Sequence, residues 1–235
     1  MRVYVTGDTH GDFKRVAAFC DFVESSKEDV IVILGDAGIN YEGKPRDSRR
    51  KTWLARFPIT FLCIHGNHEI RPERISSYEE TIRFDGIVYR EQGFPNLLFA
   101  KCGEVYNLYG NHCIAIGGAN SIDKYFRIPG VNWWPDEQPT EEIRKRVEAR
   151  LDKENWCVDI VFSHTCPYNY MPIEVLSPDI DQNLVDNRTE MWLQSIEEKL
   201  SYAEWYCGHF HTDKLVQKIR FVQDEIHELG KGVAI

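Results

Sequence analysis

Eight residues with metal-binding or acid–base side chains stand just after apolar, strand-like segments of the sequence. These residues are Asp8, His10, Asp36, Asn67, His68, His164, His209 and His211. Imidazole, carboxylate and amide oxygen together suit Mn, Fe, Zn or Co better than Ca or Mg alone. Because no cysteine is among them, the pattern disfavours a structural zinc site of the cysteine type.

The eight candidate residues are more than one metal ion needs as ligands. Two divalent ions roughly 3.5–4 Å apart, bridged by a carboxylate, would use most of them. Such a pair would stabilise negative charge on a bound substrate and lower the pKa of a bridging water toward neutrality, which would supply a hydroxide nucleophile. A neighbouring histidine could then assist departure of the leaving group. The alternative is a set of unrelated polar residues at strand ends.

The first 64 residues alternate between strands and helices. Apolar runs at 3–5, 29–34 and 58–64 read as strands, and residues 12–24 and 47–56 read as helices. This order is typical of a parallel sheet with right-handed crossovers, whose carboxyl ends meet at one edge. Ligands in such sheets bind outside that edge.

Beyond residue 84 the strands become short, at 87–89, 97–100, 105–109 and 113–117, with a hairpin turn expected at Gly110-Asn111-His112. They predict a meander that forms a second sheet. Residues 118–139 are rich in Gly and Pro, which predicts a lid or insert loop. Helices at 140–151 and 188–200 and strands at 158–162, 202–207 and within 214–229 complete a single domain over residues 1–235.

The composition limits the classes of function that are expected for this protein. With 43% hydrophobic and 28% charged residues, the chain reads as globular, and Val30–Leu34 is far too short to span a bilayer. A net charge of −9 argues mildly against generic nucleic-acid binding. No secretory signal is expected. Seven cysteines without paired spacing favour a reducing, cytoplasmic compartment.

Five sequence blocks together resemble one family. The blocks are Gly7-Asp8-x-His10-Gly11, Gly35-Asp36, Gly66-Asn67-His68-Glu69, His164 and Gly208-His209-x-His211. In this order they are similar to the calcineurin-like metallophosphoesterases, and residues 118–139 resemble a stretch of the small bacterial and phage members. The GDTHG and GNHE blocks also resemble the Ser/Thr protein phosphatases.

The resemblance implies a four-layer αββα sandwich, with two mixed β-sheets flanked by helices and a dinuclear centre at the strand ends. It assigns Asp8, His10, Asp36 and His211 to one ion. It assigns Asp36, Asn67, His164 and His209 to the other, with Asp36 shared. It gives His68 the catalytic role of protonating the leaving oxygen or stabilising the transferring phosphoryl group.

The second block departs from the protein phosphatases. Their motif continues with an Asp and an Arg, whereas this chain reads Gly35-Asp36-Ala37-Gly38-Ile39-Asn40. In those phosphatases the Asp pairs with the catalytic histidine, so the residue that pairs with His68 in this chain is undetermined. The arginine that would clamp phosphate is also open, with Arg71 and Arg127 as candidates and Arg46, Arg49 and Arg50 as competitors.

The leading hypothesis is a dinuclear-metal phosphohydrolase that acts on phosphomonoesters, either phosphoproteins or phosphorylated small molecules such as nucleotides. A phosphodiesterase or nuclease is the alternative within the same chemistry. A catalytically silent scaffold with the same fold is the alternative of another class. No membrane partner is expected, and nothing in the sequence points strongly to nucleic acid.

Overall fold

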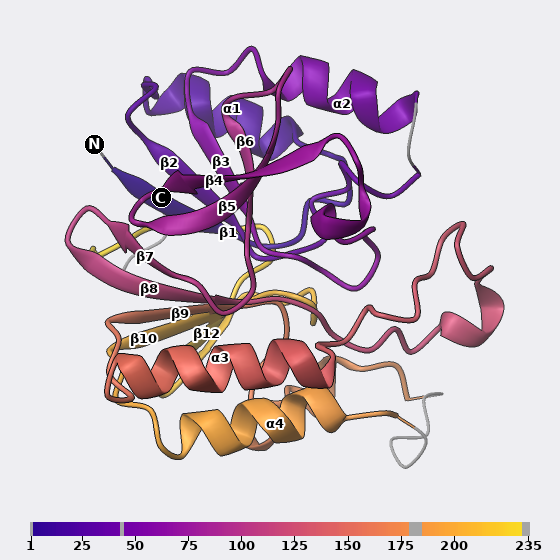
Figure 1. The fold of residues 1–235 in the computed structure, drawn as a ribbon, viewed down its shortest axis with the longest axis vertical. Coiled ribbons are helices and arrows are strands. Elements are labelled where there is room, and N and C mark those ends of the chain that lie inside the picture. Colours follow the sequence, from indigo (N-terminus) through magenta and orange to yellow (C-terminus); the bar gives the residue numbers. More distant parts are fainter. Residues whose placement is uncertain (1, 43–44, 179–184, 232–235) are drawn as a thin grey trace.

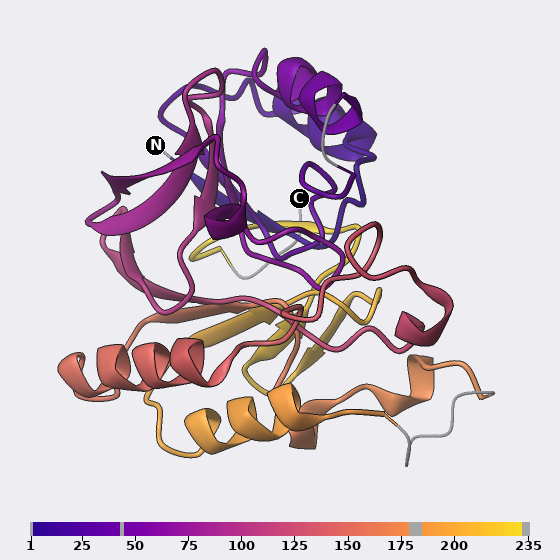
Figure 2. The same ribbon diagram turned by 45° about the vertical axis from the view of Figure 1, so that its right-hand side comes forward.

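The computed structural model describes residues 2–42, 45–178 and 185–231. Two mixed β-sheets lie face to face, and two helices cover the outer side of each sheet (Figure 1; Figure 2). This is the four-layer αββα sandwich that the sequence predicts.

The first sheet has the strand order β13-β1-β2-β3-β6-β5-β4. Its strands are β1 (Val3–Thr6), β2 (Val30–Ile33), β3 (Thr60–Cys63), β4 (Tyr78–Arg83), β5 (Gly86–Glu91), β6 (Leu97–Ala100) and β13 (Ile226–Glu228). The central strands β1, β2, β3 and β6 pair in parallel, so their carboxyl ends meet at one edge. Helices α1 (Lys14–Phe22) and α2 (Arg46–Leu54) are the crossovers between β1, β2 and β3.

The second sheet has the order β11-β12-β10-β9-β8-β7. Its strands are β7 (Val105–Leu108), β8 (Asn111–Ile116), β9 (Ile160–Ser163), β10 (Glu204–Cys207), β11 (Lys214–Val216) and β12 (Ile219–Phe221). Helices α3 (Glu141–Lys153) and α4 (Arg188–Glu197) pack on its outer face. The Thr140 hydroxyl caps α3 by accepting the Ile143 N–H at 3.3 Å, which satisfies one of the free donors of the first turn.

Three apolar layers hold the four structural layers together. Alternate residues of one strand serve different layers: Val3 and Val5 face the second sheet, whereas Tyr4 packs with Phe19 of α1. A third layer, containing Val161, Val147 and others, joins the second sheet to α3 and α4. Burial on both faces explains why these strands read as continuous apolar runs.

Three local expectations need correction. The short strands after residue 84 are not one meander, because β5 and β6 join the first sheet and only β7 and β8 join the second. The hairpin turns at Tyr109 and Gly110, which both have positive φ, and Asn111 already pairs with Leu108. Strand β4 was not predicted, because this exposed edge strand carries mostly polar residues.

In the described part of the chain, no helix is both long enough and apolar enough to cross a membrane.

Candidate metal centre

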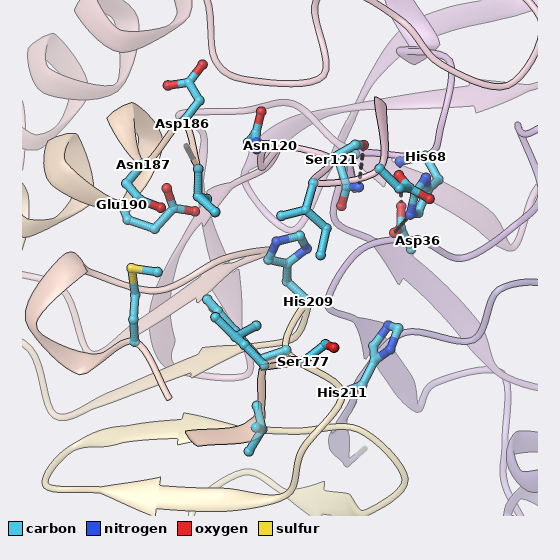
Figure 3. A pocket seen from close by; sticks show the side chains of 18 of the residues that line it. Asp36, His68, Asn120, Ser121, Ser177, Asp186, Asn187, Glu190, His209 and His211 are labelled. Carbon is cyan, nitrogen blue, oxygen red and sulfur yellow. Dashed lines mark hydrogen bonds and ion pairs between the residues drawn. The ribbon is translucent and has the colours of Figure 1, made fainter. Parts of the chain in front are cut away.

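The predicted ligands meet at the edge where the parallel strands of both sheets end. Asp8, Asp36 and Asn67 follow β1, β2 and β3 of the first sheet, and His164 and His209 follow β9 and β10 of the second. Figure 3 shows Asp36, His209 and His211 lining one cavity. The centre therefore lies between the two sheets, and neither sheet could build it alone.

Two clusters bring their potential ligand atoms within 4.8 Å of one another. One consists of Asp8, His10 and His211, and the other of Asp8, Asp36 and His164. Asp8 is common to both clusters, whereas the family resemblance gives the shared role to Asp36. Which carboxylate is shared therefore stays a prediction.

The hydrogen bonds of His164 and Asn67 orient an acceptor atom of each residue toward the other. His164 Nδ1 lies 2.8 Å from the Leu34 carbonyl, so this nitrogen must carry the proton and donate it. An imidazole that carries its proton at Nδ1 alone presents the lone pair of Nε2 to Asn67 Oδ1, which lies only 2.7 Å away. Asn67 donates its Nδ2–H to Ser121 Oγ at 2.8 Å, which turns its oxygen toward the histidine. Two acceptors that face each other in a buried site fit a shared metal ion.

His10 and His211 also face each other. Their Nε2 atoms lie 3.0 Å apart, and His10 Nδ1 lies 2.7 Å from the Tyr41 hydroxyl. Tyr41 can donate its own proton to the Asp36 carbonyl at 3.4 Å, so His10 Nδ1 can donate to Tyr41 and keep Nε2 unprotonated. Imidazole nitrogens in this state are metal ligands.

The burial, hydrogen bonds and pKa of Asp8 fit a carboxylate that binds a metal ion. Its side chain is buried, Oδ1 accepts the His209 N–H at 3.1 Å, and Oδ2 has no hydrogen-bond partner among the described residues. Burial raises the pKa of Asp8, but the nearby imidazole groups of His164, His211 and His10 outweigh burial and lower this pKa, which favours the ionised carboxylate. A buried carboxylate oxygen without a partner is costly unless a cation binds it.

Asp36 lies equally deep. Burial is the main cause that raises its pKa above the ordinary value. Its Oδ1 accepts the His68 N–H at 2.9 Å, and its Oδ2 lies 3.7 Å from His164 Nε2 and 3.8 Å from His68 Nε2. Ions at this edge would let Asp36 stay ionised, because an opposite charge nearby favours the carboxylate form.

The backbone is strained at four of the predicted ligands. His10, Asp36, His209 and His211 have φ values of 47°, 47°, 67° and 47°, in the left-handed region that side chains seldom adopt. Such conformations persist only where the surroundings enforce them, and they concentrate at functional sites.

Gly66 shows how closely the strand ends pack around these ligands. A Cβ at this position would collide with Asp36 Oδ1 and with the Asp36 backbone nitrogen. Only glycine lets the β3 end approach the β2 end this closely, and Asn67 directly follows it.

Sequence reasoning missed two supporting residues. Tyr41 orients His10, and Ser121 orients Asn67, yet neither stands in a recognisable motif. Glu69, which sequence analysis already placed beside the GNHE ligands, is fully buried and accepts the Gly38 N–H at 2.9 Å. It thereby ties the loop after β2 to the loop after β3.

His68 lies beside Arg127 of the 118–139 segment, and Asp123 of the same segment holds Arg127. Arg127 Nη2 lies 3.5 Å from His68 Nε2, and Asp123 holds the guanidinium through bonds of 2.6 Å to Nε and 2.7 Å to Nη2. Burial first, and then the charge of Arg127, lowers the pKa of His68 to about 4. All three side chains line the same cavity as the metal ligands.

The structure does not bring the other candidate arginines into this cavity. Arg71 is buried and donates from Nε to the Asp136 carbonyl at 2.8 Å. On and beside α2, Arg46 pairs with Glu42, and Arg50 donates to the Gly38 carbonyl at 3.0 Å. Arg49 projects outward and lines a separate surface groove.

The fold was compared with those of solved structures. A crystal structure that shares 13% sequence identity covers all of this chain and 97% of its own chain, with a TM-score of 0.53, which supports the fold. Another, of phosphopantetheinyl hydrolase (PptH) from Mycobacterium tuberculosis, has 14% identity, 94% and 88% coverage and a TM-score of 0.48. A search of the curated proteins found no match.

The model of the family described as calcineurin-like phosphoesterase matches residues 1–213, which include every predicted metal ligand. The residues at the strand ends offer a donor set that fits divalent metal ions. This chain belongs to the calcineurin-like phosphoesterases, and it is a metal-dependent hydrolase of phosphate esters.

Proposed function

We propose that this protein is a phosphomonoesterase whose centre holds two divalent ions, with Mn, Fe, Zn and Co as candidates. One ion would take Asp8, His10, Asp36 and His211, and the other Asp36, Asn67, His164 and His209. The facing lone pairs of His164 and Asn67 and the unpartnered Oδ2 of Asp8 support two positions of positive charge.

Divalent ions at this centre would supply Lewis-acid polarisation of phosphate oxygens and an activated water. The chain's own residues would do the rest. His68 lines the cavity, and because its pKa is lowered to about 4 it would be neutral near pH 7 and would donate a hydrogen bond to the leaving oxygen. Hydrolysis then forms one P–O bond to water and breaks the ester P–O bond, and the leaving oxygen takes a proton.

The observation that carries the proposal is the position of Arg127. Its guanidinium is the one Lys or Arg cation among the described residues that line the cavity, and it stands beside His68. A planar guanidinium can bind two oxygens of a phosphoryl group at once. Asp123 fixes its orientation through an ion pair, so Arg127 would supply the phosphate clamp whose arginine the second sequence block lacks.

The substrate would be a phosphorylated small molecule or a phosphoprotein. No membrane partner is proposed, and the acidic net charge of −9 does not favour a nucleic-acid substrate. All seven cysteines are free thiols, which supports a cytoplasmic location.

The test compares 4-nitrophenyl phosphate with bis(4-nitrophenyl) phosphate in the presence of Mn²⁺, with metal content measured on the same sample. We expect faster turnover of the monoester, and loss of nearly all turnover in Asp36→Asn and His68→Asn. Faster turnover of the diester would make the protein a phosphodiesterase. Full activity of Asp36→Asn would refute the dinuclear centre, and a sample that binds no metal near neutral pH would indicate a silent scaffold.

The variant Arg127→Ala tests the phosphate clamp. A hydrogen bond to a charged group contributes about 1.5–3 kcal/mol, so kcat/KM for the monoester should fall about 10- to 100-fold. Arg49→Ala is the matched control, because it removes the same charge from the surface outside the cavity. Equal effects of the two variants would mean that net charge, and not a clamp, matters.

A further inference from the structure

The cavity extends well beyond the metal centre. Its volume is about 650 Å³, which is the size of a pocket for a whole small molecule. Figure 3 shows Asp36 and His68 at one end, His209 in the middle, and Asp186, Asn187 and Glu190 at the other end, near the start of α4. A phosphoryl group at the centre leaves most of this space for the leaving group.

Apolar side chains from three parts of the chain form the walls of this remaining space. Met171, Val175 and Leu176 come from the segment after β9, Phe210 comes from between two metal ligands, and Ile122 comes from the 118–139 segment. Ile122 and Val175 are 47% and 42% exposed. An apolar ligand that covers these exposed side chains would remove apolar surface from water, which favours binding.

The charges of the cavity are unevenly placed. Arg127 stands beside His68, whereas Asp186 and Glu190 stand at the far end. Asp186 is ion-paired with Arg188, but Glu190 has no cation partner among the described residues. A second negative charge on a ligand would meet the carboxylate of Asp186 and, above the raised pKa of about 7, that of Glu190, which is unfavourable.

We propose that the physiological substrate is a phosphomonoester with an uncharged, largely apolar leaving group that extends from the metal centre toward α4. This inference rests on the proposed function, because the phosphoryl group must bind at the metal centre. It selects against substrates with additional negative charges, such as nucleoside polyphosphates and nucleic-acid strands.

The experiment uses a series of n-alkyl phosphates from ethyl to octyl, with release of inorganic phosphate measured in the presence of Mn²⁺. The pKa of the leaving alcohol is nearly constant along this series, so differences in rate report binding. We expect kcat/KM to rise about twofold to fourfold for each added methylene until the cavity is full. A flat series with measurable turnover would overturn the inference and leave the proposed function intact, whereas no turnover of any ester would refute the proposed function itself.

A matched substrate pair tests the charge preference. Heptyl phosphate and 6-(phosphonooxy)hexanoate have similar length, but the second carries a terminal carboxylate. At pH 8, above the raised pKa of Glu190, we expect kcat/KM to be at least about tenfold lower for the carboxylate, because it would lie among Asp186 and Glu190. Equal rates for the two esters would overturn this part of the inference.

Two variants locate the effect in the apolar wall. Val175→Ser should reduce the ratio of octyl to ethyl phosphate turnover by about threefold or more, because it removes apolar surface from the wall. Ile173→Ser is the control, since Ile173 belongs to the same segment and is 63% exposed but does not line the cavity. If both variants change the ratio equally, the leaving group does not bind along this wall.

Discussion

Glu190, in the first turn of α4, is a buried acid whose ionisation should oppose folding. It is 4% exposed, its Oε1 accepts a hydrogen bond from Thr165 at 2.8 Å, and its Oε2 has no partner among the described residues. Burial is the main cause that raises the pKa of Glu190 to about 7 from the ordinary 4.5. The carboxyl group is therefore largely protonated in the folded protein at mildly acidic pH.

The sign and size of the effect follow from proton linkage. Between pH 4.5 and 7 the folded state holds a proton that the unfolded state has released, so the free energy of unfolding falls as the pH rises. A shift of about 2.5 units corresponds to about 3 kcal/mol, because one unit is worth 1.36 kcal/mol. This contribution is complete below pH 4.5 and is lost above pH 7.

Glu190→Gln should remove this dependence, because its amide oxygen can still accept the Thr165 hydroxyl. We expect the variant to gain about 2.5 kcal/mol relative to the wild type between pH 5 and pH 8, measured by urea unfolding in the presence of EDTA. Glu198→Gln, an exposed residue just after the same helix, should change stability by less than about 0.5 kcal/mol at either pH. A difference between wild type and Glu190→Gln that is the same at both pH values would refute the reasoning.

Two further predictions concern packing and charge elsewhere. Gly66→Ala should lower turnover of 4-nitrophenyl phosphate about 100-fold, because the new Cβ displaces Asp36, whereas Gly93→Ala, with open space around it, should not; similar rates for both variants would contradict the close approach. Burial opposes the ionisation of Asp29, but hydrogen bonds from Arg2 and Ser26 outweigh it and lower its pKa to about 2. The resulting stability is present above pH 3.8 and is lost toward pH 2. Because Arg2 is partly exposed to solvent, Asp29→Asn should cost about 1–2 kcal/mol in thermal unfolding at pH 6 and less at pH 2.5; an equal cost at both pH values would contradict the ion pair.

Most of the fold could be predicted because buried parallel strands leave a plain signal. Residues 30–34 are apolar without interruption, since β2 has neighbours on both sides and layers on both faces. Strand β4 leaves no such signal, because one edge is free and most of its side chains meet solvent. The division of β5 to β8 between two sheets depends on long-range pairing that local pattern does not encode.

The candidate ligands could be found from sequence because each stands at a fixed offset from a strand end. The groups that orient them could not, because they come from loops without a regular offset. Ser121 and Arg127 lie in the 118–139 segment, whose composition predicts a loop but not its path. Tyr41 follows β2 by eight residues and reaches His10 only through the folded turn around Asp36.

The 118–139 segment connects the two proposals for this protein. It places Ser121 against Asn67, Arg127 against His68 and Ile122 in the apolar wall, so one loop contacts a predicted ligand, the candidate acid and the space for the leaving group. If the phosphate-binding arginine followed the second sequence block, as in the Ser/Thr protein phosphatases, it would belong to the loop after β2 of the first sheet. Here the clamp and a wall of the leaving-group space belong to the same loop, so a change in that loop alters phosphate binding and substrate choice together. Substitutions at Ile122 should therefore also change how Arg127 is positioned, and the two residues should show non-additive effects in a double-mutant cycle.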